Sequence, residues 1–471
     1  MSFIFINSIN NFKKNKNKIF FRDLDKSING KDCLKFIDKI IFFFKKNKIK
    51  NIAIASKNSI YWPLWYIAAD YLCKNTYILN PEINKKILKK IVKQNNIEYI
   101  VRKTEEIIGY PNVVNSSFLN GFKRIVPDTR SDILFTSGTT NIPKGVVINE
   151  LAFNHVAKLL IKKFKQSKND NELLSMPFYH SFGLTRLRCV LLANSSAIIL
   201  DGLKQFPSAY KISKDIRITG LSLVPSGIEL VKNLLKKKIS EFVKNIRYFE
   251  IGSSALNNEL RVWLKNNFKK TVILHHYGTT EASRSFIRER GVKDDFNSPD
   301  NWIGEPIEGS KYKINSSSID KEKIVGELFL KGKNLFSCYL EKSLNKKKII
   351  KDYFKTGDIC SIENNKVLLI GRNDNQFNIG GYTVQAELIE KIIEEIDQVK
   401  SCLCFRSNDK VLGDQINCIV ELIKNSKIEI FNRKMNDSFI NTPQYYRPKK
   451  VYFQKVRLTS NGKKIRNIKI K

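Results

Sequence analysis

Alternating strand-like and helix-like patterns run through most of this 471-residue chain. Residues 51–55 form a short apolar run that predicts a strand, and the following apolar segment through Trp62 and Tyr66 predicts a helix. The same alternation recurs at residues 96–102, 131–160, 197–200 and 220–235. Strands that alternate with helices in this way are typical of a layered α/β architecture.

The pattern changes twice in the last third of the chain. Residues 326–370 indicate short strands separated by turns, such as Asn364-Asn365, and predict a small β subdomain. After Gly371, helical spacing of apolar residues predicts an amphipathic helix, which involves Val384, Leu388, Ile389, Ile392, Ile393 and Ile396. Strand patterns follow at 401–405 and 416–422. The predicted fold is therefore a large N-terminal layered α/β domain with a small β subdomain, plus a small α+β C-terminal domain.

Length and composition favour a globular protein of two or three domains. A hydrophobic content of 42% is sufficient to bury substantial cores. No stretch approaches the ~18 uninterrupted apolar residues of a transmembrane helix. The apolar start of residues 1–7 precedes the first lysines, which is the reverse of a secretory signal. We therefore expect a soluble, cytoplasmic protein without a transmembrane segment.

The net charge of +38 raises the possibility of nucleic-acid or membrane binding. The lysines are spread along the chain among many Asn and Ile residues, which indicates compositional bias at solvated positions. Because no nucleic-acid-binding motif accompanies them, we expect no specific nucleic-acid partner. The charge can still attract anionic ligands over long distances.

The eight cysteines and four histidines show no metal-binding spacing. Cys402 and Cys404 would share one face of a strand, which favours packing over metal binding. The adjacent His275 and His276 would point to opposite faces of a strand. We therefore expect reduced, packed thiols and no histidine-based metal centre.

Residues 136–145, TSGTTNIPKG, form the most informative segment of the chain. Small residues let backbone N–H groups approach an anion, hydroxyls add donors and the lysine adds positive charge, a combination that suits phosphates. Apolar, strand-like residues 133–135 and 146–148 flank the segment. The loop is therefore predicted to join two strands, unlike the common phosphate loop that opens a helix.

Other short motifs follow this loop in a fixed order. The clearest are residues 277–281 (YGTTE), 353–358 (YFKTGD), 371–374 (GRND) and 461–466 (NGKKIR). Weaker ones lie before the loop at 79–81 and after it at 177–183, 252–256 and 326–328. Together they resemble the AMP-forming acyl-CoA synthetases of the adenylate-forming superfamily, from about residue 20 to the end. Asn141 stands where that family usually has glycine, which is a mild departure because Asn tolerates positive φ.

The resemblance implies a function and a domain plan. The function is ATP-dependent activation of a carboxylic acid to acyl-AMP with release of pyrophosphate, followed by transfer to CoA. ATP, Mg²⁺ and CoA are the implied cofactors. The implied plan is an AMP-binding domain at 1–370, a hinge at 371–374 with Asp374 at the hinge position, and a mobile C-terminal cap at 375–471.

The resemblance also implies nucleotide-binding residues. The phosphates would lie on Thr136, Ser137, Gly138, Thr139, Thr140, Lys144 and Gly145. Tyr277 would pack on the adenine, and Gly252, Ser253 and Ser254 would line the adenine side of the pocket. Gly278 and Thr279 would also contact the nucleotide. Asp358 would accept hydrogen bonds from both ribose hydroxyls, and Arg372 would reach the nucleotide.

The implied catalytic residues are Lys463, Glu281 and Thr280. Glu281 would hold Mg²⁺, and Thr280 would contact the α-phosphate or its metal. Lys463 would bridge the substrate carboxylate and the α-phosphate, where an ammonium group offsets transition-state charge. Its neighbour Lys464 stands where the family usually has an apolar residue and is a minor alternative.

The acid itself is less defined. His180, Phe182 and Val224 would line the acyl pocket. Because residues 177–193 contain no Asp or Glu, an amino acid substrate is disfavoured and a fatty or aryl acid is favoured. Gly380 and Gly381 would shape the thiol tunnel, although Asn378 and Thr383 depart from the common pattern there.

Two alternatives remain open. The acyl group could pass to the phosphopantetheine of an acyl carrier protein instead of CoA. In another class, the chain could be a non-catalytic basic binding protein on the same fold; the presence of Lys463, Glu281 and Asp358 argues against this.

Overall fold

The computed structural model describes residues 3–72, 75–109, 131–136, 143–252, 256, 258–290, 298–316, 324–379, 382–409, 413–440, 442–459 and 463–466. The chain divides into two compact units. Unit 1 comprises Met1–Phe296, Gly304–Lys311 and Lys331–Asp352, and unit 2 comprises Asn297–Ile303, Tyr312–Leu330 and Tyr353–Lys471.

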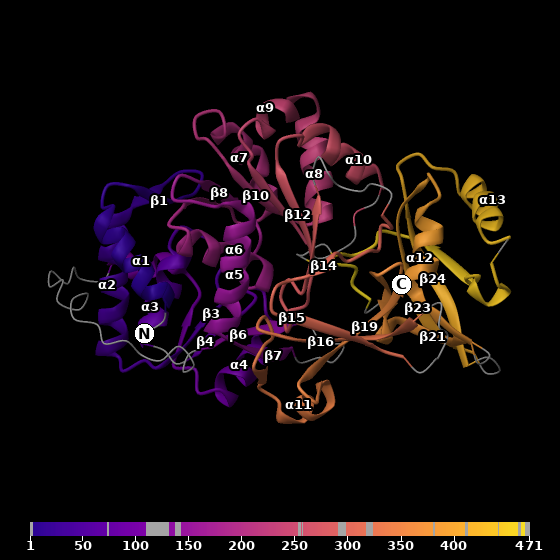
Figure 1. Ribbon diagram of the computed structural model, residues 1–471, viewed down its shortest axis with the longest axis horizontal. Helices are drawn as coiled ribbons and strands as arrows, with labels where there is room; N and C mark the ends of the chain where they lie inside the picture. The colour runs from indigo at the N-terminus through magenta and orange to yellow at the C-terminus, as the bar shows by residue number, and fades with distance from the viewer. Residues whose placement is uncertain are drawn as a thin grey trace. The chain divides into compact units, whose positions relative to one another are not determined.

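Unit 1 contains helices and two large sheets (Figure 1). Its helices are α1 (Phe3–Lys14), α2 (Gly30–Lys46), α3 (Trp62–Leu72), α4 (Lys85–Gln94), α5 (Glu150–Phe164), α6 (Ser181–Leu192), α7 (Phe206–Ile212), α8 (Pro225–Leu235), α9 (Ile239–Val243), α10 (Asn258–Asn267) and α11 (Lys342–Lys348), with short 3-10 turns η1 (Thr104–Gly109), η4 (Leu203–Gln205) and η5 (Lys236–Lys238).

The larger sheet has the order β14-β13-β12-β11-β10-β8-β9-β1-β2, and β8 to β12 run parallel within it. Its strands are β1 (Ile19–Arg22), β2 (Ser27–Asn29), β8 (Asn171–Leu174), β9 (Ser196–Ile199), β10 (Gly220–Leu223), β11 (Tyr248–Ile251), β12 (Val272–Tyr277), β13 (Phe286–Arg290) and β14 (Glu305–Pro306). Neighbouring residues pack on opposite faces: Phe249 and Ile273 join the core formed with α7 to α10, whereas Tyr248 and Leu274 join the core formed with α5. Helices therefore cover both faces, which is the predicted layered α/β arrangement.

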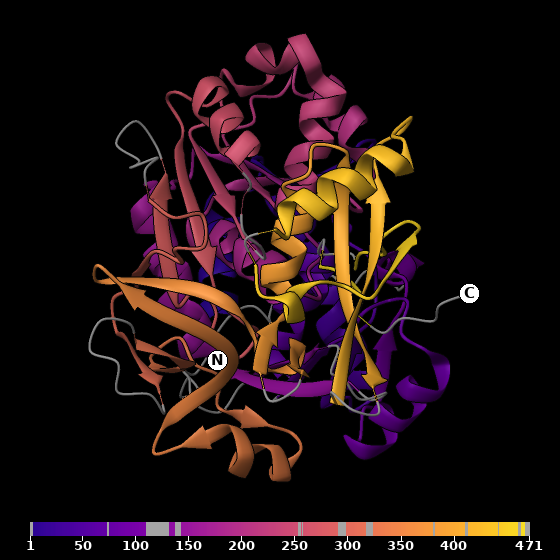
Figure 2. The same cartoon turned by 90° about the vertical axis from the view of Figure 1, so that its right-hand side faces the viewer.

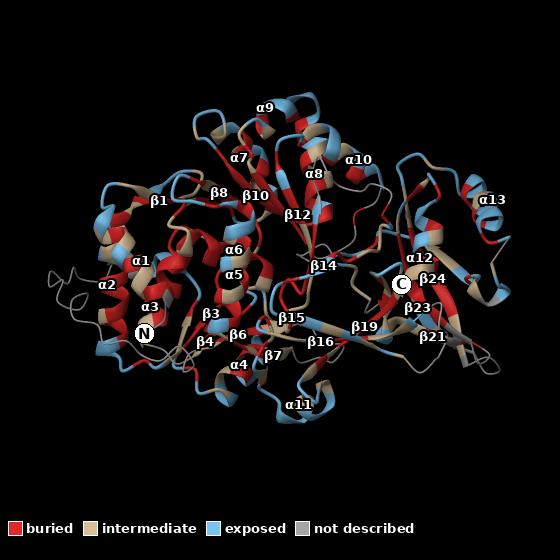
Figure 3. Cartoon of the chain, viewed as in Figure 1, coloured by how far each residue is buried: buried red, intermediate tan, exposed pale blue. Residues whose placement is uncertain are grey.

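The second sheet of unit 1 has the order β17-β7-β6-β4-β3-β5. Its strands are β3 (Asn51–Ile54), β4 (Asn75–Ile78), β5 (Tyr99–Val101), β6 (Ser131–Thr136), β7 (Lys144–Asn149) and β17 (Cys338–Tyr339). The predicted strand at 51–55 and the predicted helix through Trp62 are thus confirmed as β3 and α3. Helix α3 is buried over most of its length (Figure 3). Its Trp62, Trp65 and Tyr66 are almost fully buried.

Unit 2 contains most of a third sheet and the whole of a fourth, seen from the side in Figure 2. The third sheet has β15 (Ser310–Asn315), β16 (Ile324–Gly332), β18 (Ile349–Ile350), β19 (Tyr353–Glu363) and β20 (Lys366–Arg372). Asn364 and Asn365 join β19 to β20 with φ of 49° and 60°. Two left-handed residues are what a tight hairpin requires, so the turn predicted there is confirmed.

The fourth sheet has the order β22-β21-β24-β23, and β25 pairs with β24. Its strands are β21 (Gln376–Ile379), β22 (Tyr382–Gln385), β23 (Val399–Asp409), β24 (Gly413–Leu422) and β25 (Lys450–Phe453), and it is accompanied by α12 (Ala386–Glu394), α13 (Ile428–Ser438), η6 (Asn373–Asn375) and η7 (Gln444–Tyr446). Ile389 and Ile393 of α12 share a core with Cys402 and Val420 of the sheet. The predicted α+β pattern after Gly371 is therefore confirmed, but the helix is shorter than predicted, because Val384 lies in β22 and Ile396 lies beyond the end of α12. Within the described residues, no helix is long and apolar enough to cross a membrane.

Candidate functional site

The predicted phosphate loop connects two paired strands. Thr136 ends β6, Lys144 begins β7, and these two residues lie directly opposite each other in an antiparallel ladder. The prediction that the loop joins strands is therefore confirmed at both ends. Ser137, Gly138, Thr139 and Thr140 lie outside the described residues.

Strand β17 connects the strand that follows this loop to Glu281. Tyr339 of β17 pairs with Val146 of β7, and the Leu340 N–H donates to the Gly145 carbonyl at 2.9 Å. The Tyr339 hydroxyl donates to Glu281 Oε1 at 2.8 Å. Two motifs more than a hundred residues apart are thus held by one tyrosine.

The turn from Tyr277 to Glu281 is compact. Tyr277 ends β12, and a Cβ at Gly278 would lie 2.4 Å from the backbone nitrogen of Arg284, so this position requires glycine. The Thr279 hydroxyl accepts from the Ala282 N–H at 3.1 Å. Thr280 lies inside this closed turn, which fixes its backbone.

Glu281 is suited to hold a magnesium ion. Glu281 is half-buried, and its carboxylate accepts a hydrogen bond from the Tyr339 hydroxyl. Its backbone carbonyl accepts from the Phe336 N–H at 2.7 Å, which holds the backbone in place. Mg²⁺ prefers oxygen ligands and is commonly bound by one or two carboxylates together with water and substrate phosphates. The donor type at this position therefore fits the ion.

His276, to which no sequence motif pointed, lies beside Gly252, and its side chain is 8% exposed. A Cβ at Gly252 would lie 2.2 Å from Cε1 of the His276 ring, so the glycine is required for this close approach. His276 Nδ1 lies 2.8 Å from Glu250 Oε1, and Arg284 Nε donates to the same oxygen at 3.0 Å. Ser253 and Ser254 lie outside the described residues.

The charges in this group shift one another's pKa values. Burial alone would raise the pKa of Glu250, but Arg284 and His276 hold it well below its usual range. Burial, followed by the charge of Arg284, lowers the pKa of His276. These shifts favour the neutral form of the His276 ring and the ionised form of the Glu250 carboxylate.

Two of the predicted acyl-pocket residues come together. Phe182 and Val224 form an apolar cluster with Met176, and Leu203 packs against it. The Phe182 ring meets the His276 ring edge-on, with centroids 4.9 Å apart. His276 therefore contacts one residue predicted for the nucleotide pocket and one predicted for the acyl pocket.

His180 lies two residues before Phe182 in the sequence. It precedes the first residue of α6, and its ring packs against Tyr179 with centroids 4.4 Å apart. Arg284 Nη2 donates to the Phe182 carbonyl at 3.1 Å, which fixes the start of the same helix.

In unit 2, Asp358 and Arg372 form an ion pair. They lie directly opposite each other on β19 and β20, and Arg372 Nη1 lies 2.8 Å from Asp358 Oδ1. The Asp358 side chain is 6% exposed and that of Arg372 is 42% exposed. The Thr356 hydroxyl also accepts from the Asp358 N–H at 3.0 Å. The structure thus joins two residues that the sequence suggested separately.

The C-terminal motif is anchored by ion pairs on α12. Lys464 Nζ contacts Glu390 at 3.0 Å and Glu394 at 2.8 Å, and Arg466 contacts Glu390 at 2.7 Å and Glu387 at 3.2 Å. Burial alone would lower the pKa of Lys464, but the two carboxylates raise it above its ordinary value.

Lys463 differs from its neighbour. It is exposed, and its backbone exchanges hydrogen bonds with Thr459: its N–H donates to the hydroxyl at 3.1 Å and its carbonyl accepts from the N–H at 2.7 Å. The Lys464 side chain is thus held by two carboxylates of α12, whereas Lys463 is held through its backbone.

Only part of the predicted hinge and thiol tunnel lies within the described residues. Asp374 is exposed in η6, and its neighbour Asn375 donates from its side chain to Glu387. Gly380 and Gly381 lie outside the described residues. The hinge therefore stays a prediction.

Residues 11–340 match the model of a protein family described as AMP-binding enzyme. Among curated proteins, the chain is similar to acyl-CoA synthetase ALT10 of Alternaria alternata, with 26% identity over 62% of this chain and 56% of that protein. It is also similar to a malonate–CoA ligase of Arabidopsis thaliana, with 25% identity over 73% of this chain and 59% of that protein. The matches thus span less than two thirds of these relatives' length.

Solved structures share the fold over nearly the whole chain. The O-succinylbenzoate coenzyme A synthetase of Bacillus subtilis in complex with ATP and magnesium has a TM-score of 0.82 at 15% identity, over 98% of each chain. ATP-bound MatB from Rhodopseudomonas palustris has a TM-score of 0.79 at 18% identity, over 97% of this chain and 96% of that one.

Proposed function

The chain belongs to the AMP-binding enzyme family, and on this premise we propose that it is an AMP-forming acid–thiol ligase. In the first step, the carboxylate of an acid attacks the α-phosphate of ATP, so that acyl-AMP forms and pyrophosphate leaves. In the second step, the thiol of CoA attacks the acyl carbon, so that a thioester forms and AMP leaves. The names of the curated relatives, acyl-CoA synthetase and malonate–CoA ligase, support this proposal.

The observation that carries the proposal is the link through Tyr339. Its hydroxyl orients Glu281, while its strand pairs with β7, the strand that begins at Lys144. A cation for phosphate oxygens and a carboxylate for a divalent cation are the two charges that ATP-Mg²⁺ requires. Because β17 contacts both Glu281 and the strand that begins at Lys144, it holds the backbone segments that carry these two residues close to each other.

The remaining nucleotide contacts follow from the same proposal. The 136–145 loop would hold the β- and γ-phosphates, and Thr280 would contact the α-phosphate or its metal. Mg²⁺, when bound at Glu281, would neutralise charge on the phosphates. Tyr277 would pack on the base, and Gly278 and Thr279 would contact the nucleotide. Asp358 would accept from the ribose hydroxyls, with Arg372 beside it.

Lys463 is the residue that we assign to the adenylation step. Its ammonium group would neutralise the carboxylate and α-phosphate oxygens as they approach. Lys464 would have a separate role, because its two ion pairs on α12 fix the segment that carries Lys463. For thioester formation, we propose that the C-terminal cap turns at Asp374 and that Gly380 and Gly381 then line the thiol path.

The acid would have an uncharged fatty or aryl tail. Met176, Phe182 and Val224 are buried and apolar, and His180 lies two residues before Phe182. The second acceptor candidate is an acyl carrier protein, which the high positive charge of the chain would attract. A place in fatty acid metabolism and a cytoplasmic location belong to the same proposal.

The test is pyrophosphate release over a panel of carboxylic acids, with no acceptor, with CoA and with an acyl carrier protein. We expect pyrophosphate with fatty or aryl acids and thioester only when a thiol is present. Lys463→Ala should reduce acid-dependent pyrophosphate release by about 10²–10³, yet leave thioester synthesis from supplied acyl-AMP largely intact. Lys455→Ala, which removes another exposed lysine of the same tail, is the matched control. Absence of acid-dependent pyrophosphate would favour the non-catalytic binding protein instead.

A further inference from the structure

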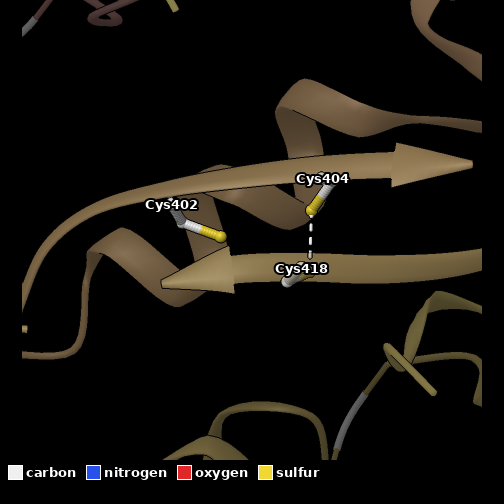
Figure 4. Close-up of side chains that lie close together, drawn as sticks. All are labelled: Cys402, Cys404 and Cys418. Atoms are coloured by element: carbon white, nitrogen blue, oxygen red, sulfur yellow. Dashed lines mark hydrogen bonds between the residues drawn. The ribbon is translucent and has the colours of Figure 1, made fainter. Parts of the chain in front are cut away.

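Three cysteines of unit 2 gather on one face of the fourth sheet (Figure 4). Cys402 and Cys404 lie on β23 and Cys418 lies on β24. The Sγ atoms of Cys404 and Cys418 are 3.0 Å apart, and all three sulfur atoms lie within 4.8 Å of one another. Among the described residues, these are the only His, Cys, Asp and Glu side chains that form such a group.

The strand register produces this arrangement. Cys404 pairs directly with Cys418. The Cys402 and Cys404 N–H groups donate to Glu394 and Glu390 of α12, not to β24. Both cysteines therefore occupy positions where the ladder bonds are absent and the side chains of opposing residues approach most closely. The two-residue period of the strand then brings Cys402 to the same face.

The cluster is closed to solvent. Cys402 and Cys418 are fully buried and Cys404 is 2% exposed. An oxidant or a partner thiol would have to open the sheet to reach the sulfurs. A metal ion taken up as the domain folds has no such difficulty, because binding and folding are then one process.

We propose that Cys402, Cys404 and Cys418 form a buried thiolate site for a soft metal cation of the class that includes Zn²⁺ and Cu⁺. Thiolate ligands select such ions over hard cations. Three sulfur ligands about 2.3 Å from a metal ion in a trigonal plane lie about 4.0 Å from one another. The Sγ atoms of Cys404 and Cys418, which are 3.0 Å apart, would therefore separate by about 1 Å, and sulfurs at the 4.8 Å limit would approach by about 0.8 Å. Three S–H bonds are replaced by three S–metal bonds, and three protons are released.

The surroundings supply compensating charge. Three thiolates leave one negative charge around Zn²⁺ and two around Cu⁺. Glu390, which accepts from the Cys404 N–H, is already paired with Lys464 and Arg466, and the Arg466 side chain also donates to the Cys404 carbonyl at 3.1 Å. Two cations therefore stand next to the site. None of the three cysteines belongs to the proposed nucleotide or acid positions, so this inference stands apart from the proposed function.

The experiment uses the full-length protein, purified under reducing, oxygen-free conditions. Metal-free protein is titrated separately with Zn²⁺ and with Cu⁺ against a chromophoric chelator, and bound metal and released protons are counted. We expect one equivalent of one of the two ions. The ion that binds identifies the site: Zn²⁺ would need a fourth ligand from solvent or chain, whereas Cu⁺ would accept three.

The variants Cys402→Ser, Cys404→Ser and Cys418→Ser should each weaken binding at least tenfold, with Cys402→Ala as a second variant in case a buried hydroxyl disturbs folding. Cys360→Ser is the matched control, because Cys360 is an equally buried thiol of unit 2 outside the cluster. Far-UV circular dichroism of the metal-free variants checks the fold. The proposal is overturned if neither ion binds, if the control weakens binding as much as the cluster variants do, or if the purified protein carries a Cys404–Cys418 disulfide.

Discussion

Replacing Lys464 with alanine separates an anchoring lysine from a catalytic one. The side chain is 23% exposed, and its two partners differ: Glu390 is 4% exposed and Glu394 is 34% exposed. The bond to the buried carboxylate is worth about 1.5–3 kcal/mol, and the bond to the more exposed one about 0–1 kcal/mol. Because Glu390 keeps Arg466 as a partner, we expect a net loss of about 1–3 kcal/mol.

Lys464→Ala should therefore affect thermal stability more than it affects the rate of adenylation. A change of 1 kcal/mol moves the midpoint of a domain of this size by about 2–4 °C, so unit 2 should melt several degrees lower. Adenylation should fall by no more than about tenfold, since Arg466 still holds the segment. Lys463→Ala should leave the melting temperature unchanged and reduce adenylation by about 10²–10³, the usual effect of removing a group that stabilises transition-state charge.

The assay combines scanning calorimetry with acid-dependent pyrophosphate release. Lys464→Arg should recover both stability and rate, because a guanidinium can contact both carboxylates. Lys463→Arg should not recover the rate. If Lys464→Ala leaves the melting temperature unchanged but removes adenylation, the roles of the two lysines are reversed and the anchoring argument is wrong.

Asp358→Ala should weaken ATP binding by at least tenfold in calorimetric titration, because two charge-assisted hydrogen bonds, each worth about 1.5–3 kcal/mol, are lost; unchanged affinity would remove Asp358 from the ribose site. Asp374→Pro should keep pyrophosphate release on the first turnover and lose thioester formation, because proline fixes φ near −65° at the proposed hinge; a normal thioester rate would place the hinge elsewhere. His276→Gln should reduce the loss of stability on acidification. The folded pKa of His276 lies below its ordinary value of 6.5, so the unfolded chain binds the proton first and stability falls as pH drops below about 6.5. Equal melting-temperature changes in variant and parent between pH about 8 and about 5.5 would contradict this.

The local pattern of apolar and polar residues was sufficient to predict the helices and strands, including the two strands that flank the predicted phosphate loop. The apolar segments around residues 136–145 predicted the paired strands β6 and β7, and the Asn364-Asn365 pair predicted the β19–β20 hairpin. The direct opposition of Asp358 and Arg372 follows from that hairpin, but only once its register is known.

Long-range contacts could not be predicted in this way. Cys418 is fourteen residues from Cys404, and only the ladder of β23 and β24 makes them neighbours. The sequence therefore favoured simple packing of the thiols. The sequence showed His276 only as one of two adjacent histidines on opposite faces of a strand. Its contacts in the folded protein depend on Glu250 and Arg284, which come from other segments, so no local sequence pattern predicts them.

The path of the chain between the two units has a consequence for its synthesis. The boundaries fall at 296/297, 303/304, 311/312, 330/331 and 352/353, so unit 1 still lacks segments when residue 296 has left the ribosome. β17, which orients Glu281, arrives with residues 338–339. Residues 301–303 of unit 2 find their partners only after β20 has been synthesised, because Asn301 and Ile303 form hydrogen bonds with Leu369 and Val367 of that strand. Each unit is assembled from three segments that alternate along the chain, and a fragment cut at residue 370 would contain all of unit 1 but only part of unit 2.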